Sequence, residues 1–270
     1  MDANIMGLAG KAALVIGGGF GIGRESSILL GRAGANVMVA DLDIGRAEGV
    51  RDELTAMGVK AAAISGDVTK KAEAEAIVDA AIKFHGSLEV LINMVGLAEW
   101  GTLMMIDEAV WERQFAINLN HHIYVGTHAA RYMIDNKIAG RMAFVASVSG
   151  IYGAPYHPAY GASKAGLMSL VRTMSQEWGE HGIRVNAVAP DVIATPRVAV
   201  GFESRGIDEA ARNKTAADEL VSLKRFGQPF EIAAPLVFLC SDWAGFMTGQ
   251  TLIVDGGVNA AFPHNMNPFK

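Results

Sequence analysis

Cysteine is almost absent from this chain, because Cys240 is the only one among 270 residues. A single cysteine excludes an intrachain disulfide and any metal site built from several thiolates. Basic residues are not in excess, since the net charge is −5, and no basic stripe is present that would bind nucleic acid. The chain also has no run of about 18 uncharged apolar residues, the length that a membrane-spanning helix needs.

The first residues carry neither the basic end nor the apolar stretch of a signal peptide, so we expect a cytoplasmic protein with no membrane partner. Apolar residues make up 51% of the chain and charged residues 19%, a composition typical of a folded globule. With 270 residues the chain can bury a large core, and we expect one α/β domain over residues 1–270.

Short apolar runs alternate with longer amphipathic stretches along most of the chain. The runs predict strands at 12–16, 35–40, 61–64, 89–92, 142–146, 183–188 and 251–254. The stretches predict helices at 22–32, 46–57, 71–84, 107–132, 159–178 and 229–240. This alternation predicts a Rossmann-type, doubly wound parallel sheet of about seven strands with helices on both faces. Segment 194–225 has no clear strand, and we expect it to form a mobile substrate lid.

A glycine-rich turn at 16–23 follows the first predicted strand and opens the first predicted helix. Its glycines fit the pattern G-x-x-x-G-x-G, with Gly17, Gly21 and Gly23, and not G-x-G-x-x-G, because position 24 is Arg24. Glycine lets the backbone approach a pyrophosphate, and the amino end of a helix favours an anion. The turn therefore indicates a dinucleotide site, with a plain strand–helix turn as the alternative.

Asp41 ends the second predicted strand, about twenty residues after the turn, where a carboxylate hydrogen-bonds the ribose diol of a dinucleotide. The same carboxylate would repel the 2′-phosphate of NADP. Neither Leu42 nor Phe20, which hold the neighbouring positions, supplies an arginine to bind that phosphate. We therefore predict NAD as the cofactor, while Arg24 and Arg46 remain as residues that could accommodate NADP.

A tyrosine followed four residues later by a lysine occurs at Tyr160 and Lys164. On a helix these positions share a face, so the ammonium can lie beside the phenol. A nearby cation favours the phenolate, and we expect it to lower the pKa of Tyr160 toward the range of a general base. Tyr152 and Tyr156 are each followed at this spacing by another tyrosine, so neither has the lysine.

These motifs together resemble the short-chain dehydrogenase/reductase family. The resemblance spans residues 11–257 and rests on the glycine turn, Asn93 to Gly96, Asn118, Ser147, Tyr160 with Lys164, Pro190 with Thr195, and Asp255 to Gly257. The four-residue spacing differs from the wider spacing of the enoyl reductase branch. The lysine likewise differs from the arginine that related dehalogenases carry.

The resemblance implies four catalytic residues. Tyr160 exchanges the proton of the substrate hydroxyl, and Ser147 holds the substrate oxygen. Lys164 lowers the pKa of Tyr160 and hydrogen-bonds the nicotinamide ribose. Asn118 breaks its helix locally and helps hold a water that links Lys164 to solvent. The implied reaction is reversible oxidation of a secondary alcohol to a ketone, with hydride transfer to nicotinamide.

The resemblance also implies the residues that contact NAD. They are Gly17, Gly19, Phe20, Gly21, Ile22, Asp41, Leu42, Asp67, Val68, Asn93, Val95, Gly96, Tyr160, Lys164, Pro190, Asp191, Ile193 and Thr195. For Asp67 an ordinary turn or helix-capping role is the alternative. Ile16, Met94, Val95 and Asp191 depart from the residues usual in the family, and we expect them to tune cofactor affinity.

The candidate substrate contacts are Ser147, Leu97, Trp100, Tyr152, Tyr156, His157, Phe202 and Phe246. Such a set suits a bulky hydrophobic alcohol or ketone that is cyclic, aromatic or steroid-like, although ordinary core packing also explains each residue. We predict no metal, because the neighbouring His121 and His122 point to different helix faces and no carboxylate or thiol cluster accompanies them.

The resemblance implies a homotetramer, built through the helices that carry Asn118 and Tyr160. The apolar tail at 258–270 would fit packing against a neighbouring subunit. Two other functions remain open. One is an NADPH-dependent ketoreductase, and the other is a non-catalytic NAD-binding sensor or scaffold, which the departures at Ile16, Met94 and Asp191 favour.

Overall fold

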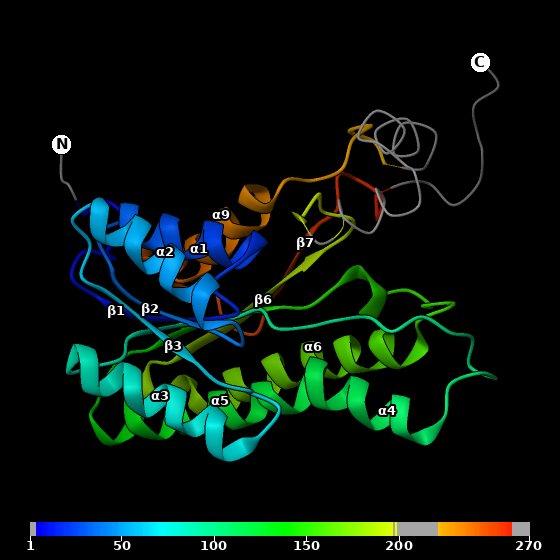
Figure 1. Cartoon of the computed structure of the whole chain (residues 1–270), viewed down its shortest axis with the longest axis horizontal. Coiled ribbons are helices and arrows are strands. Elements are labelled where there is room, and N and C mark those ends of the chain that lie inside the picture. Colours follow the sequence, from blue (N-terminus) through cyan, green and yellow to red (C-terminus); the bar gives the residue numbers. More distant parts are fainter. Residues whose placement is uncertain (1–3, 197, 199–220, 261–270) are drawn as a thin grey trace.

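The computed structural model describes residues 4–196, 198 and 221–260. In this part of the chain seven parallel strands form one sheet in the order β3-β2-β1-β4-β5-β6-β7 (Figure 1). The strands are β1 (Ala12–Ile16), β2 (Asn36–Asp41), β3 (Ala61–Ser65), β4 (Val90–Asn93), β5 (Arg141–Val145), β6 (Arg184–Pro190) and β7 (Thr251–Val254). The predicted doubly wound parallel sheet is confirmed.

Helices cover both faces of the sheet (Figure 1). One face carries α1 (Gly21–Arg32), α2 (Ile44–Ala56) and α9 (Pro229–Leu239). The other carries α3 (Lys71–His85), α4 (Glu108–Phe115), α5 (His121–Asp135) and α6 (Pro158–Trp178). Parallel strands need such crossover helices, and this requirement buries the sheet on both sides.

Strand β1 shows why the apolar runs become central strands. All five of its side chains are buried. Leu14 and Ile16 pack into the core under α3, α5 and α6, whereas Ala13 and Val15 pack into the core under α1, α2 and α9. Successive side chains of a strand point to opposite faces, so a strand between two helical layers is apolar at every position.

The predicted helix over 107–132 is three segments in the structure. Helix α4 ends at Phe115, a π-helical turn covers Ala116–Asn120, and α5 begins at His121. The other predicted elements are present, with ends that differ by one or two residues. Most of the expected lid at 194–225 and of the tail at 258–270 lies outside the described residues. Within the described ranges, no helix has the length and apolar character needed to cross a membrane.

Candidate active site

The candidate site residues gather at the carboxyl ends of the parallel strands. The strand order reverses between β1 and β4, because β2 and β3 lie to one side of β1 and the later strands to the other. In an open parallel sheet, ligands bind where the order reverses, at the carboxyl edge. The glycine turn follows β1 at this point, and the 94–96 segment follows β4.

The glycine turn is packed too tightly for a side chain at Gly18, Gly19 and Gly23. Gly17 has a φ of +76°, and a Cβ on Gly23 would lie 1.8 Å from the carbonyl oxygen of Gly17. The amides of Gly17 and Gly18 both donate to the carbonyl of Ala40, at 2.8 and 3.0 Å, which ties the turn to β2. Helix α1 then begins at Gly21 with no side chain capping its amino end. This bare helix end behind a glycine cradle fits a pyrophosphate.

Asp41 lies at the end of β2 against the glycine turn. Its Oδ2 accepts a hydrogen bond from the Gly19 amide at 3.1 Å, and its Oδ1 accepts one from the Asp43 amide at 3.1 Å. The carboxylate therefore stands beside the turn, as a contact to a dinucleotide ribose requires.

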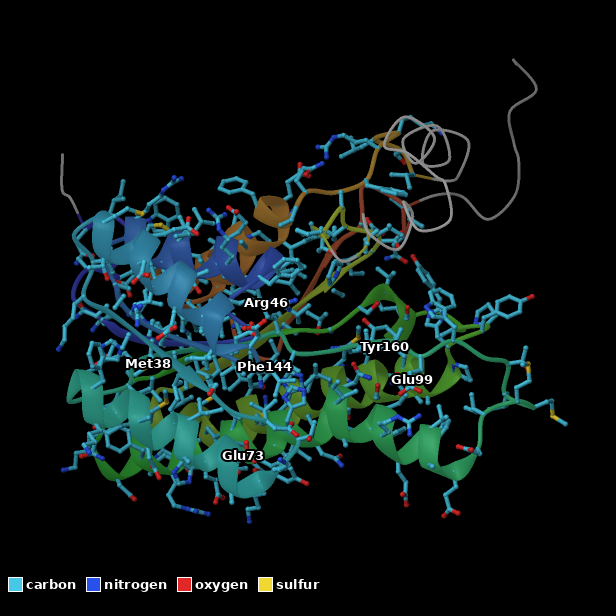
Figure 2. All side chains as sticks on the ribbon, in the orientation of Figure 1. Met38, Arg46, Glu73, Glu99, Phe144 and Tyr160 are labelled. Carbon is cyan, nitrogen blue, oxygen red and sulfur yellow. The ribbon has the colours of Figure 1, made fainter. Side chains whose placement is uncertain are left out.

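Two arginines near this end differ in their surroundings. The guanidinium of Arg46, on α2, lies 4.7 Å from the centre of the Phe20 ring, and a Cβ built on Gly19 would lie 2.8 Å from the Cβ of Arg46 (Figure 2). Arg24 instead pairs with the carboxylates of Glu53 and Glu25. Of the two arginines that could accommodate NADP, Arg46 is the one that borders the glycine turn.

The other predicted cofactor residues line the same edge. Val95 and Met94 border Gly17, since a Cβ built there would lie 3.2 Å from Cγ2 of Val95 and 3.3 Å from Cγ of Met94. Thr195 faces Gly21 at 3.6 Å by the same measure. The remaining residues hold the following positions: Ile22 is in the first turn of α1, Leu42 is exposed after β2, Val68 is buried after β3, Asn93 ends β4, Gly96 borders Lys164, Pro190 ends β6, and Asp191 and Ile193 follow β6.

Asp67 makes an ordinary turn. Its Oδ1 accepts hydrogen bonds from the amide of Thr69 at 3.0 Å and from the hydroxyl of the same residue at 2.6 Å. These hydrogen bonds, followed by the charge of Lys70, lower the pKa of Asp67. The local role that the sequence left open for Asp67 is present, and its place after β3 keeps it near the carboxyl edge.

Tyr160 and Lys164 lie on one face of α6, with Ser147 opposite them at the end of β5. The Nζ atom of Lys164 is 5.7 Å from the centre of the Tyr160 ring and donates a hydrogen bond to the Val145 carbonyl at 2.8 Å. Ser147 lies beside the Tyr160 phenol and lowers the pKa of that group. Lys164 and Ser147 are buried, and Tyr160 is partly buried.

The expected fall in the pKa of Tyr160 is wrong for this structure. Burial raises the pKa of Tyr160, and the Ser147 side chain beside it offsets only part of that rise. Burial also lowers the pKa of Lys164 to about 7. The i, i+4 spacing does place the two side chains together, but removing both from water disfavours the charged form of each.

Asn118 sits in the π-helical turn and fastens it to the segment after β4. Its Oδ1 accepts from the Leu97 amide at 2.9 Å, and its Nδ2 donates to the carbonyls of Leu97 and Gln114, each at 2.9 Å. The predicted local break of this helix is therefore present at Asn118. The break gives the turn a fixed side-chain anchor beside Lys164.

Sequence reasoning missed two residues of this network, Gln114 and Glu99. Gln114 accepts from the Glu99 amide at 3.3 Å and donates to the Glu99 carboxylate at 3.2 Å. Arg113 holds the same carboxylate with two hydrogen bonds of 2.8 and 2.7 Å. Glu99 and Tyr160 lie at the same end of the molecule (Figure 2). The signal that could have found Gln114 is its place one helical turn before Asn118.

Five candidate substrate contacts lie in the segments after β4 and before α6, here called the rim of the site: Leu97, Trp100, Tyr152, Tyr156 and His157. Tyr156 is 62% exposed with a φ of +67°, and its carbonyl accepts from the Gly101 amide at 2.7 Å. The ring centre of His157 lies 4.9 Å from that of Trp100 and 5.8 Å from that of Tyr160, and the rings are tilted in both pairs. His157 therefore connects the rim with the catalytic tyrosine.

Two more rim residues, Leu97 and Tyr152, are 41% and 42% exposed. The hydroxyl of Tyr152 donates to Oδ1 of Asn259 at 2.6 Å. Phe202 lies outside the described residues. Phe246 is wrong as a contact, because it is fully exposed and precedes β7, on the edge of the sheet opposite the site.

The two adjacent histidines are nearer to each other than the sequence suggested. The ring centres of His121 and His122 are 4.0 Å apart, and both side chains are buried. In the described part of the chain, no three histidine, cysteine, aspartate or glutamate side chains are placed to hold a metal. An apolar hollow of about 630 Å³ lies elsewhere, lined by α1, α9 and the amino-terminal segment, on helices that carry none of the catalytic set.

A family model described as enoyl-(acyl carrier protein) reductase matches residues 18–259. Together with the fold, this match defines the chain as an oxidoreductase of alcohol and keto compounds. The chain belongs to the short-chain dehydrogenase/reductase family, whose enzymes use a nicotinamide cofactor, NAD or NADP.

Relatives with known names act on different substrates. The chain is 34% identical to 2-keto-3-deoxy-L-fuconate dehydrogenase of Xanthomonas campestris, over 93% of this chain and 80% of that protein. It is 33% identical to 3beta-hydroxysteroid dehydrogenase 2 of Eggerthella lenta, over 94% of this chain and 96% of that protein. The crystal structure of levodione reductase superposes with a TM-score of 0.87 at 28% identity, covering 94% of this chain and 99% of the other.

Proposed function

We propose that this protein is an NAD-dependent oxidoreductase that interconverts a secondary alcohol and a ketone by general acid/base catalysis at Tyr160. One observation carries the proposal. Tyr160, with Ser147 beside its phenol and Nζ of Lys164 5.7 Å from its ring centre, lies at the same sheet edge as a glycine cradle in which Gly23 has no room for a side chain. The four-residue spacing of tyrosine and lysine supports alcohol or ketone chemistry over enoyl reduction.

In alcohol oxidation, Tyr160 accepts the hydroxyl proton while Ser147 holds the oxygen in place. In ketone reduction, Tyr160 returns the proton to the same oxygen. A bound nicotinamide supplies the hydride acceptor or donor. When Lys164 is protonated, its charge close to the phenol favours the ionised form of Tyr160, and Asn118 keeps the wall beside Lys164 in place.

The cofactor would lie along the carboxyl edge of the sheet. Its pyrophosphate fits the cradle of Gly17, Gly19, Phe20, Gly21 and Ile22, and its adenosine end fits Asp41, Leu42, Asp67 and Val68. Its nicotinamide half fits Asn93, Val95, Gly96, Tyr160, Lys164, Pro190, Asp191, Ile193 and Thr195. The carboxylate of Asp41 beside Gly19 supports NAD, because it would face the 2′-phosphate of NADP.

An NADPH-dependent ketoreductase is the second candidate function. The observation in its favour is Arg46, whose guanidinium lies over Phe20 beside the glycine turn. Among the described residues, this guanidinium forms an ion pair with Asp43 alone, whose Oδ2 is 3.4 Å from Nε of Arg46. A guanidinium binds a phosphate well, so this arginine could offset the repulsion by Asp41.

For the substrate we propose a bulky hydrophobic secondary alcohol or ketone, bound by Ser147, Leu97, Tyr152, Tyr156, His157 and Phe202. Similarity to a hydroxysteroid dehydrogenase supports a cyclic substrate, whereas similarity to a keto-deoxy-fuconate dehydrogenase supports a polar one. We also propose a single domain and a cytoplasmic location, as length and composition predict, and a homotetramer, as the family resemblance implies.

The test is a fluorescence titration with NADH beside NADPH, followed by a panel of secondary alcohols and ketones read through the absorbance of the reduced cofactor. The proposal expects tighter binding of NADH, with turnover of a bulky secondary alcohol. Tight NADH binding with no turnover across a broad panel would favour the sensor or scaffold function. Tighter binding of NADPH would support the ketoreductase and count against the proposed role of Asp41.

A further inference from the structure

His121 is a fully buried histidine outside the predicted catalytic set, and both of its ring nitrogens are used. Its Nδ1 lies 3.1 Å from Nδ2 of Asn93, and its Nε2 lies 3.0 Å from the carbonyl oxygen of Ile117. The Asn93 amide donates, so Nδ1 accepts and Nε2 carries the proton that is donated to Ile117. The pKa of His121 is lowered to about 3, mainly by burial and to a smaller extent by the charge of Lys164, and the ring is therefore neutral.

One of the two hydrogen bonds of the His121 ring joins it to Asn93, the last residue of β4. Oδ1 of Asn93 accepts from the Val95 amide at 3.4 Å, which directs its Nδ2 toward His121. The residues that follow β4 are wedged between the glycine turn and the catalytic lysine. A Cβ on Gly96 would lie 3.0 Å from Nζ of Lys164 and 2.9 Å from Oδ1 of Asn118. A shift of this segment would therefore move the wall of the Lys164 site.

The other hydrogen bond joins the ring to the π-helical turn at Ala116–Asn120. A π turn replaces the i→i−4 hydrogen bonds with i→i−5 bonds, so side-chain donors can reach carbonyls at its borders. The His121 ring donates to the carbonyl of Ile117 in the turn, and Asn118 donates to that of Gln114 just before it. The same turn carries the Asn118 side chain that pairs with both backbone groups of Leu97. The two hydrogen bonds of His121, here named the His121 brace, thus connect the turn with the end of β4.

We propose that His121 is a positioning residue, whose brace fixes the π-helical turn against the 94–96 segment so that Asn118 and Lys164 keep the geometry that proton transfer from Tyr160 needs. This inference rests on the proposed function at Tyr160. Catalytic groups that lose their support by about 1 Å can lose about a hundred-fold in rate without losing ligand binding. The brace acts on proton transfer and not on the distant adenosine end of the cofactor.

His122 provides a matched control on the same helix. It is as buried as His121, and neither of its ring nitrogens has a hydrogen-bond partner among the described residues. Its ring packs on Phe144 at 5.0 Å. Replacing His122 by leucine removes a ring of the same size from the same core but breaks no hydrogen bond to either segment.

The test compares His121→Leu, His121→Gln, His121→Asn and His122→Leu. Leucine removes both hydrogen bonds, glutamine keeps a donor for Ile117, and asparagine keeps an acceptor for Asn93. We expect His121→Leu to lower kcat by about ten-fold to a hundred-fold, with KM and NADH affinity changed less than about two-fold. We expect a larger solvent isotope effect on kcat, partial recovery in the glutamine and asparagine variants, and normal kcat in His122→Leu.

A second measurement needs no turnover. Backbone amide exchange of Leu97 and of the 116–120 turn should become faster in His121→Leu and stay unchanged in His122→Leu. This result separates a failure of the brace from a failure of the proposed dehydrogenase, because it does not depend on finding a substrate. Equal kcat in His121→Leu and the wild type would overturn the proposal. Equal losses of kcat in His121→Leu and His122→Leu would also overturn the proposal, because they would point to packing alone. Insolubility of all three His121 variants would do the same.

Discussion

Lys164 is the residue whose environment most affects the chemistry of the site. Its ammonium is buried, donates to the Val145 carbonyl at 2.8 Å, and has its pKa lowered to about 7 by burial. Tyr160 beside it has its pKa raised by the same cause. The pair therefore favours neutral side chains until another cation or hydrogen-bond partner enters the site.

Replacing Lys164 by methionine should change the pH dependence of the reaction. Alcohol oxidation needs the phenolate, so its rate rises with pH, whereas ketone reduction needs the phenol and slows as pH rises. Without the ammonium the pKa of Tyr160 stays high, and the rise in oxidation rate should move to higher pH. The measurement is kcat against pH at saturating cofactor. An unchanged profile in the variant would contradict this role of Lys164.

Asp41 should decide the choice of cofactor. Replacing it by serine removes a charge that would face a 2′-phosphate, which is worth about 1 kcal/mol or more. We expect NADPH affinity to rise about ten-fold relative to NADH, measured by fluorescence titration. Arg46→Gln is the matched variant, and it should lower the affinity for NADPH while leaving that for NADH unchanged. A wild-type protein that binds NADPH more tightly than NADH, and loses that preference in Arg46→Gln, would instead favour the ketoreductase.

The glycine turn and the start of α1 act as one element, because backbone fills the space that a side chain would need. The amide of Gly23 donates to the carbonyl of Phe20 at 3.0 Å, which closes the first turn of the helix against the cradle. A Cβ on Gly23 would lie 1.8 Å from the Gly17 carbonyl oxygen, and that contact is backbone that cannot rotate away. The cradle therefore depends on the absence of a side chain at this position.

Gly23→Ala should displace the turn. We expect a loss of about 2 kcal/mol or more in the free energy of unfolding and at least about ten-fold weaker NADH binding. The control is Gly49→Ala in α2, where nothing lies within 4 Å of the added Cβ. There alanine should raise stability by about 0.5–1 kcal/mol through helix propensity and leave NADH binding intact. Equal effects of the two substitutions in urea unfolding would contradict the packing argument.

Over the whole molecule, several buried histidines make stability depend on pH. Burial lowers the pKa of His85 from 6.5 to about 4, that of His121 to about 3, and that of His122 well below 6.5. In the unfolded chain these rings take up protons as pH falls through about 6.5, whereas the folded chain takes them up only at lower pH. Because the unfolded state binds more protons in this window, stability must fall as pH falls through it.

We therefore expect the free energy of unfolding to decrease steadily from pH 6.5 toward pH 4.5. The carboxylate of Glu231, whose pKa is lowered to about 2 by Arg225, adds its own loss only below about pH 4.5. Urea unfolding at a series of pH values measures the slope, and His122→Leu should reduce it. A flat profile over this window would contradict the neutral state of these histidines.

How far the sequence predicts this molecule differs from feature to feature. The strands are predictable because a sheet covered on both faces is apolar at each position, as in β1. The raised pKa of Tyr160 is not, since spacing shows which groups meet but not how far both are removed from water. Periodicity does not predict the π turn, because the hydrogen bonds of Asn118 and His121 that support it come from contacts outside the helix. The break at Asn118 is expected only from the family resemblance. The rim residues belong to loops whose exposure no periodicity reveals.

The measurement that tests the central claim most directly compares Tyr160→Phe with the wild type in single-turnover reaction and in NADH titration. Phenylalanine keeps the ring and its packing but removes the proton-exchanging hydroxyl. The account predicts a fall in rate of about a thousand-fold or more with NADH affinity unchanged. Comparable rates in the variant and the wild type, with equal NADH binding, would show that Tyr160 is not the general acid/base.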